Sequence, residues 1–315
     1  MNKKAYDIIG DIHGQAEELI NLLQKMGYKV NRTGVFQHET RTAVFLGDFI
    51  DRGNQQIKVI DIVRPMVETG SALAVMGNHE FNAIAYYLTH SETGEYLRLH
   101  TESNRKQHCA FLNEFEPDPS LYQSTINWFM SLPLWLDLNG LKIIHACWDQ
   151  ACIDRLHSTL DDGLYVNKEI MQRASDPSFW EFSTIETLLK GKEIPLKSGH
   201  SFFDKDGNER HNIRVRWWDQ SATTYKTAFM GPESVLTHIP DDEITGDHLI
   251  EYSHEEVPVF LGHYWMTGKP IPLAKNIACV DYSVAKPGGK LVAYRWDGEN
   301  QLNENKYVSV ERNDK

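Results

Sequence analysis

Five short apolar segments of this chain each run into a polar residue. They occupy residues 6–11, 43–48, 73–78, 141–145 and 257–263. Apolar or β-branched runs of this length, closed by glycine and a polar group, are typical of a buried strand that ends in a loop. Since the loops at the ends of such strands gather along one edge of a sheet, we expect these polar residues to meet there.

The segments between the predicted strands show helical spacing. Residues 17–27 place apolar side chains three and four positions apart and stop at a glycine, which predicts a helix. A second helix is predicted over residues 57–67. We expect it to be interrupted or kinked at Pro65, because proline lacks the N–H that a helix interior needs. Alternation of strands and helices favours parallel units in a layered α/β fold.

Two longer segments interrupt this alternation. Residues from about 81 to 140 are predicted to form a mostly helical excursion. Residues from about 149 to 256 contain helical stretches, a turn and a strand around residue 214. We interpret both as insertions into a single domain that spans residues 1–315. The chain is predicted to end with a hairpin over residues 279–296 and a polar tail from about Glu299.

Several side chains at the predicted strand ends are of types that bind metal ions. Asp11 and His13 lie two positions apart, so both side chains point the same way where the strand ends. The other candidates are Asp48, Asn78, His145 and His263. Carboxylate, amide and imidazole groups without a thiolate are typical of a site for a hard or borderline metal ion.

Five motifs follow one another along the chain. They are GDIHG at 10–14, GDFIDRG at 47–53, GNHE at 77–80, a histidine after a strand at 145, and Gly-His at 262–263. This series resembles the calcineurin-like metallophosphoesterases, and the DRG and GNHE endings are similar to the bacterial type of the phosphoprotein-phosphatase branch. The resemblance covers residues 10–263. It implies an α/β fold with a two-sheet β-sandwich flanked by helices, and a mixed helical/β cap insertion over residues 149–256.

The resemblance also implies a dinuclear metal centre. The ligands of one ion would be Asp11, His13 and Asp48. The ligands of the other would be Asp48, Asn78, His145 and His263, so that Asp48 bridges the two ions. Trp265 stands where many members carry a further histidine, which would leave open positions for water on the first ion. The expected metal is Mn²⁺, while Fe or Zn²⁺ also suits nitrogen and oxygen ligands.

Three residues beside the ligands have side chains suited to catalysis, and the resemblance assigns them the same roles. His79 cannot easily bind the same ion as its neighbour Asn78, so it is free to act as general acid to the leaving oxygen. Asp51 would orient and charge His79. Arg52 would bind phosphate oxygens through its planar guanidinium.

A second phosphate-binding arginine is expected from the family. Arg214 and Arg216 alternate along a predicted strand, so their side chains share one face. Either could reach the site, and the alternative is that both are exposed on a polar strand face. The ten histidines outside the motifs, His108 among them, include many expected surface residues, and none is assigned a catalytic role.

These residues predict a metal-dependent phosphatase that hydrolyses phosphomonoesters, with phosphoproteins among the candidate substrates, by a water activated at two metal ions. One alternative is a symmetrical dinucleoside polyphosphate (Ap4A-type) hydrolase or a phosphodiesterase. That branch often lacks an Asp at the place of Asp51 and has Asp in place of Glu80. The third hypothesis is a non-catalytic metal-binding scaffold, which would have little reason to keep every ligand together with His79. The insertion over residues 149–256 is expected to shape substrate access.

Composition restricts the partners and the compartment. The net charge of −12 opposes binding to nucleic acid or an acidic membrane, although metal ions would reverse the sign locally for a phosphorylated substrate. The four cysteines show no disulfide spacing, and the N-terminus lacks the apolar core of a signal peptide. We therefore expect a cytoplasmic hydrolase with reduced thiols, and the sequence leaves the oligomeric state open.

Overall fold

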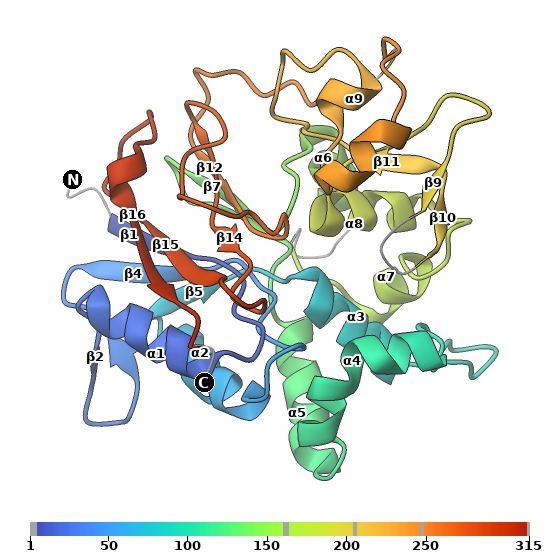
Figure 1. Cartoon of the computed structure of the whole chain (residues 1–315). Helices are drawn as coiled ribbons and strands as arrows, with labels where there is room; N and C mark the ends of the chain where they lie inside the picture. The colour runs from blue at the N-terminus through green and yellow to red at the C-terminus, as the bar shows by residue number, and fades with distance from the viewer. Residues whose placement is uncertain (1–4, 160–163, 204–206, 245, 247–248, 314–315) are drawn as a thin grey trace.

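Two β-sheets face each other in the computed structural model, which describes residues 5–159, 164–203, 207–244, 246 and 249–313 (Figure 1). The larger sheet has the order β14-β15-β1-β4-β5, and β16 also pairs with β15. Its strands are β1 Ala5–Ile9, β4 Arg41–Phe45, β5 Ala72–Ala74, β14 Asp281–Tyr282, β15 Lys290–Trp296 and β16 Tyr307–Glu311. The smaller sheet, in the order β13-β12-β7-β6, consists of β6 Trp135–Asp137, β7 Lys142–Ile144, β12 Val259–Leu261 and β13 Ile277–Cys279.

The strands that precede the predicted ligands run parallel within each sheet. β1 pairs with β4 and β4 with β5, while β7 and β13 both pair with β12. Side chains alternate between the two faces, so that Ile8 and Val44 of the larger sheet enter one buried cluster with Phe260 of the smaller sheet. This cluster confirms the predicted two-sheet sandwich. Parallel strands end at the same edge, and the loops that carry the predicted ligands begin there.

Two helices cover the outer face of the larger sheet. α1 (Ala16–Lys25) lies against β15 and β16, and α2 (Gln56–Glu68) lies against β5, as the sequence predicted (Figure 1). α2 continues through Pro65 and is not interrupted there. Proline leaves the carbonyl of Asp61 without its helical partner, but Asp61 is exposed, so water can hydrate that carbonyl. A small hairpin of β2 (Lys29–Val30) and β3 (Phe36–Gln37) follows α1.

The first insertion consists of three helices that lie at the lower right of Figure 1. They are α3 Asn78–Tyr87, α4 Glu102–Phe115 and α5 Pro119–Met130. The Thr101 side chain accepts the N–H of Asn104 at the start of α4, and Asp118 caps α5 in the same way. The chain then enters the smaller sheet at β6, so the excursion ends before residue 140.

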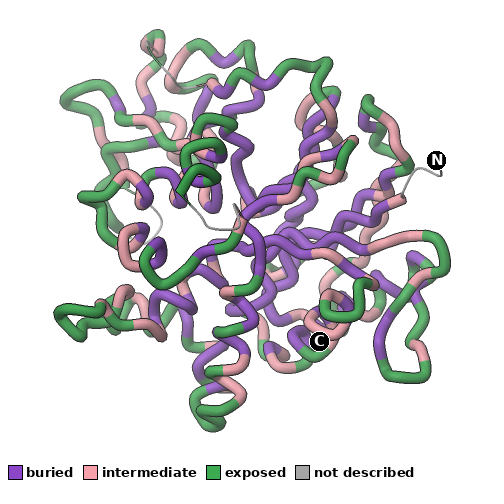
Figure 2. The backbone as a smooth tube through the Cα atoms, turned by 180° about the vertical axis from the view of Figure 1, so that it is seen from behind, coloured by how far each residue is buried: buried purple, intermediate pink, exposed green. Residues whose placement is uncertain are grey.

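The second insertion combines helices with short strands and has a small apolar cluster of its own. Its elements are α6 Gln150–His157, α7 Lys168–Arg173, α8 Trp180–Lys190, β8 Glu193–Pro195, β9 Phe202–Phe203, β10 Glu209–Arg210, β11 Asn212–Arg214, α9 Tyr225–Ala228 and the 3₁₀ helix Glu233–His238. Ile213, Val215 and Phe229 belong to the separate cluster. Figure 2 shows burial concentrated in the central strands and exposed backbone towards the rim of the molecule.

The C-terminal segment corrects one prediction. The predicted hairpin is present, because β14 pairs with the start of β15. The predicted polar tail from Glu299 is wrong, since a 3₁₀ turn (Glu304–Lys306) leads into β16, which pairs along β15. Val308 and Val310 alternate with polar residues and pack on the main core, a period-two signal too short to stand out in a polar segment. In the part of the chain that the structure describes, no helix has the length and apolar character that crossing a membrane requires.

Candidate metal centre

The loops after five strands bring the predicted ligands to one place. Asp11 and His13 follow β1, Asp48 follows β4, Asn78 begins α3 after β5, His145 follows β7 and His263 follows β12. The backbone N–H groups of Ile12 and His13 both donate to the carbonyl oxygen of Asp48, at 3.0 and 2.9 Å, which ties the first two loops together. His13, Asp48 and His263 have φ values of 48°, 51° and 69°. Left-handed backbone is costly for residues with a Cβ, and such strain gathers at functional sites.

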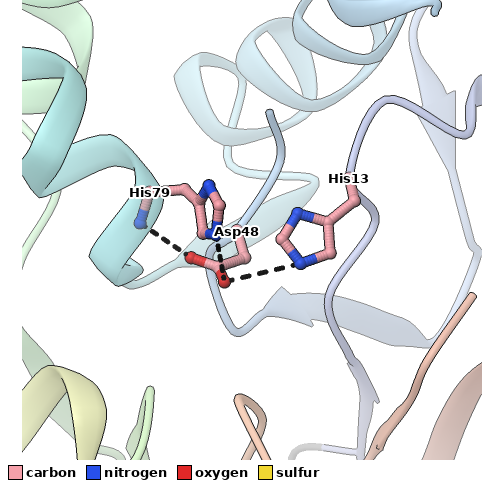
Figure 3. A group of neighbouring side chains, drawn as sticks. All are labelled: His13, Asp48 and His79. Atoms are coloured by element: carbon pink, nitrogen blue, oxygen red, sulfur yellow. Dashed lines mark hydrogen bonds and ion pairs between the residues drawn. The ribbon is translucent and has the colours of Figure 1, made fainter. Parts of the chain in front are cut away.

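The Asp48 carboxylate lies between two imidazole rings (Figure 3). Its Oδ2 is 3.6 Å from His13 Nε2 and 3.9 Å from His79 Nε2, while the backbone N–H of His79 donates to Oδ1 at 3.0 Å. His13, Asp48 and His79 therefore form one group with the spacing of a metal site. The geometry leaves His79 able to act either as a metal ligand or as an acid, because its Nε2 faces the Asp48 carboxylate.

A second group lies on the other side of Asp48. His145 Nε2 is 3.4 Å from Asp48 Oδ1 and 3.1 Å from Asn78 Oδ1, and His263 Nδ1 is 2.8 Å from the same Asn78 oxygen. Asp48, His145 and His263 again have the spacing of a metal site. Asp48 is thus common to both groups, and its bridging role, which the resemblance implies, stays a prediction.

Three carboxylates are buried at this edge of the sheets. Asp11, Asp48 and Asp281 are each at most 2% exposed. Burial raises the pKa of Asp11 well above its usual range, and the negative charges of Asp281 and Asp48 raise it further. Asp11 accepts the backbone N–H of His263 at 3.1 Å, whereas Asp281 accepts those of Trp265 and Ser283 at 2.7 and 2.9 Å. Burial therefore favours the neutral form of Asp11, and a nearby cation would be needed to keep all three carboxylates charged.

The imidazole hydrogen bonds also suit metal ions. Nδ1 of His13 donates to the carbonyl of Ile50 at 2.9 Å, and Nδ1 of His145 donates to that of Leu46 at 2.6 Å. Each bond fixes the tautomer and leaves the lone pair of Nε2 directed at Asp48, which is how metal-binding histidines are usually held. Among the described residues, His13 Nε2 is buried without a hydrogen-bond partner. The donor set therefore fits two divalent cations, one on each side of Asp48.

His79 is held by a carboxylate on the side away from Asp48. Its Nδ1 donates to Asp51 Oδ2 at 2.5 Å. Burial alone would lower the pKa of His79, but the charges of Asp48 and Asp51 outweigh it and raise the pKa. The other oxygen of Asp51 accepts from His108 Nδ1 at 2.8 Å. His108 is only 4% exposed, and the expectation that such histidines are mostly surface residues is wrong for it.

Arg52 follows Asp51 in the loop after β4, and its side chain extends towards His79. Its Nη2 lies 3.4 Å from His79 Nε2, and its guanidinium carbon lies 3.9 Å from the centre of the Trp265 ring. The Lys286 ammonium lies 3.7 Å from the centre of that ring. Both contacts have cation–π geometry, so the indole of Trp265 holds two positive groups beside the carboxylates.

The two predicted arginines lie differently. Arg214 is half-buried, its charge contributes to lowering the pKa of His263, and its Nη2 donates to Glu193 at 3.3 Å. Arg216 is exposed. The sequence pattern of residues 214–216 could not predict which of the two arginines is more buried, since burial depends on the residues that pack over the strand.

The sequence patterns assigned no role in the site to two residues that shape it. Glu80 is fully buried, and its carboxylate accepts the N–H groups of Asp48, Phe49 and Gly77 at 2.8, 2.9 and 3.0 Å. It thereby joins the second loop to the third. Asp281 had a usable signal, because the apolar run over 277–280 ends in it as the other strands end in their ligands.

Comparison with known proteins identifies the family. A profile of the calcineurin-like phosphoesterases matches residues 6–264. The chain is similar to the asymmetrical bis(5'-nucleosyl)-tetraphosphatase PrpE of Bacillus velezensis, with 47% identity over 146 residues, which are 45% of this chain and 56% of that protein. PrpE of Oceanobacillus iheyensis is 36% identical over 141 residues, 44% and 54% of the two chains. The chain thus spans about half the length of these curated relatives.

One solved structure supports the fold alone. A protein serine/threonine phosphatase from Saccharomyces cerevisiae aligns with a TM-score of 0.52 over 99% of this chain and 81% of that one, at 16% identity. The family profile spans every predicted ligand, and it confirms the resemblance that the five motifs carried. This chain belongs to the calcineurin-like phosphoesterases, hydrolases that act on phosphate esters with the help of divalent metal ions.

Proposed function

We propose that this chain hydrolyses phosphomonoesters, either small molecules or phosphoproteins, with His79 as the general acid. The observation that carries the proposal is the position of His79. Its Nδ1 donates a hydrogen bond to Asp51 Oδ2 at 2.5 Å, while its Nε2 faces Asp48 and lies 3.4 Å from Arg52 Nη2. In the contact with Arg52 the Nε2 accepts, because a guanidinium can only donate. A phosphate bound by Arg52 would take up that donor, and an imidazolium at His79 would then direct its Nε2 proton to the leaving oxygen.

The proposed ligands are the six residues predicted from the motifs, Asp11, His13, Asp48, Asn78, His145 and His263. When bound there, two divalent ions supply an activated water and positive charge for the phosphate oxygens. Mn²⁺ is the proposed metal, and Fe or Zn²⁺ would suit the same donors.

The residues of the chain account for the remaining steps. Arg52, with Arg214 as the proposed second arginine, binds the phosphate oxygens. The activated water gives one proton to solvent and its oxygen forms the new bond to phosphorus as the bond to the leaving oxygen breaks. His79 Nε2 gives its proton to that oxygen, and the Asp51 carboxylate stabilises the charged imidazole before the transfer.

The second insertion is the proposed substrate cap within a single domain. Trp217 Nε1 donates to the hydroxyl of Tyr264 at 3.1 Å, and that hydroxyl donates to the carbonyl of Ala146 at 3.1 Å. The insertion is thus anchored beside the strand ends that carry His145 and His263. Arg214 on β11 belongs to this insertion, and its charge helps to lower the pKa of His263, which supports a role of the insertion in substrate access.

A dinucleoside polyphosphate hydrolase is the second candidate function. It is supported by the activity for which the PrpE relatives are named, and by Lys286, which places a second cation on the Trp265 ring that Arg52 also contacts. A substrate with several phosphates could use both charges. A nucleoside phosphate departs readily without a proton, however, so it has less need of an acid at His79.

One experiment tests both candidates. The protein is stripped with a chelator, reloaded with Mn²⁺ and assayed on para-nitrophenyl phosphate, an alkyl phosphate and diadenosine tetraphosphate. His79→Asn should keep the bound metal but slow the alkyl phosphate by about 10²–10⁴-fold, and slow the nitrophenyl ester much less. His254→Asn, the same change at an exposed position, serves as the control.

Three outcomes would change the proposal. Loss of metal in His79→Asn would make His79 a ligand, as its place beside His13 and Asp48 allows. A higher kcat/KM of the wild-type protein for diadenosine tetraphosphate would favour the second candidate. Equal slowing of both monoesters would remove the acid role.

A further inference from the structure

The Asp51 carboxylate is held from two sides by two histidines. Oδ2 accepts from His79 at 2.5 Å, and Oδ1 accepts from His108 at 2.8 Å. His108 comes from α4, 57 positions further along the chain. Burial would raise the pKa of Asp51, but the hydrogen bonds from His108 and His79 outweigh it and lower the pKa. The carboxylate is therefore held as an anion with one oxygen for each ring.

α4 also holds the loop that carries Asp51 at a second point. Glu114, near the end of α4, accepts the backbone N–H groups of Gln56 and Ile57, each at 2.9 Å, where α2 begins. The Gln56 side chain in turn accepts the N–H of Asp51 at 2.7 Å and donates to the carbonyl of Gly53 at 2.7 Å. The first insertion thus fixes both the backbone and the side chain of Asp51.

The surroundings of His108 suit a fixed group better than a proton carrier. Its ring stacks on Phe111, with ring centres 4.7 Å apart, and lies tilted against Tyr86 at 5.4 Å. Among the described residues its Nε2 is buried and has no hydrogen-bond partner, so the hydrogen bond of its ring is the one that Nδ1 makes to Asp51. His108 belongs to neither of the two groups with the spacing of a metal site, and positioning is the role that fits its contact with Asp51.

We propose that His108 is a positioning residue for the reaction: it fixes the Asp51 carboxylate so that His79 Nε2 stays aimed at the leaving oxygen. This inference rests on the proposed acid role of His79. Without the His108 bond, the Asp51 carboxylate can turn about its last side-chain torsion, and the His79 ring can turn with it. A misplacement of about 1 Å in such a group can cost about 100-fold in rate.

Three substitutions of His108 separate positioning from packing. His108→Asn places an amide N–H near the position of Nδ1, so it should keep the bond to Asp51. His108→Gln places its amide near the position of Nε2, and His108→Leu has no donor. Gln and Leu should slow an alkyl phosphate about 10- to 100-fold and para-nitrophenyl phosphate less than about threefold, while Asn stays within about threefold of wild type on both. KM and metal content should be unchanged in all three.

The variants distinguish a wrong positioning role of His108 from a wrong acid role of His79. If Asn slows the alkyl phosphate as much as Leu, or if Gln and Leu slow both esters equally, His108 is only a packing residue and the inference is wrong. His108→Gln keeps a polar side chain of helix-forming type, so the test remains decisive if the Leu variant unfolds.

His79→Asn is measured in the same assays as the His108 variants. If it shows no dependence on the leaving group, the acid role itself fails and this inference with it, whereas dependence in His79→Asn without dependence in the Gln and Leu variants refutes only the role of His108.

Discussion

Replacing Asp7 with alanine should weaken the fold and leave the chemistry intact. Asp7 is fully buried in β1, where its Oδ1 accepts from Arg41 Nε at 2.8 Å and from Arg295 Nε at 3.0 Å. The two arginines lie on β4 and β15, the neighbours of β1 on either side. One carboxylate thus joins three adjacent strands of the larger sheet.

The size of the effect follows from what each arginine retains. Removing one partner of a buried ion pair typically costs about 3–5 kcal/mol. Arg41 keeps bonds to the carbonyls of Tyr6 and Trp296, and the Arg295 side chain is 29% exposed, so the lower end applies. We expect Asp7→Ala to lose about 3 kcal/mol of unfolding free energy, or roughly 6 °C of Tm at about 2 °C per kcal/mol for a chain of this size. Asp7→Asn keeps the accepting oxygen but loses the charge, which should cost about 2 kcal/mol.

The assay is urea unfolding followed by tryptophan fluorescence, with Asp61→Ala at an exposed position of α2 as the control. Asp11 lies four residues beyond Asp7, about 13 Å along an extended chain, so kcat well below the Tm should stay within about twofold of wild type. An Asp7→Ala variant as stable as wild type would show that the carboxylate does not hold the strands together. If Asp7→Ala were more stable than wild type, the desolvation penalty of these buried charges would exceed the attraction between them.

Two other predictions concern the centre and the thiols. In Gly262→Ala the new Cβ would lie 2.2 Å from Asp11 Oδ1, so the carboxylate must move. Metal affinity should fall about 10- to 100-fold in a titration with Mn²⁺, and unchanged affinity would exclude Asp11 as a ligand. Cys109 is exposed, whereas burial raises the pKa of the other three cysteine thiols. At pH 8 iodoacetamide should modify Cys109 first and the others only after unfolding, and mass spectrometry of early time points checks the order.

The proposed ligands of the centre could be selected from the sequence because they are local features. Asp11, Asp48 and His145 each stand at the end of an apolar run, and the covalent chain alone places a strand-end residue at the edge of its sheet. The same logic predicted the helices over residues 17–27 and 57–67, whose spacing is read within a few turns. The apolar run over residues 277–280 carries the same signal for Asp281.

The tertiary structure decided which residues that are distant in the sequence contact one another. Nothing near His108 marks it as the partner of Asp51, because the bond depends on how α4 packs against α2 rather than on neighbours in the chain. Arg214 and Arg216 share a strand pattern, and only the covering residues leave one half-buried and the other exposed. β16 forms because β15 offers it an unpaired edge. Sequence periodicity determines which face of an element is apolar, whereas contacts across many residues depend on packing that only the folded chain provides.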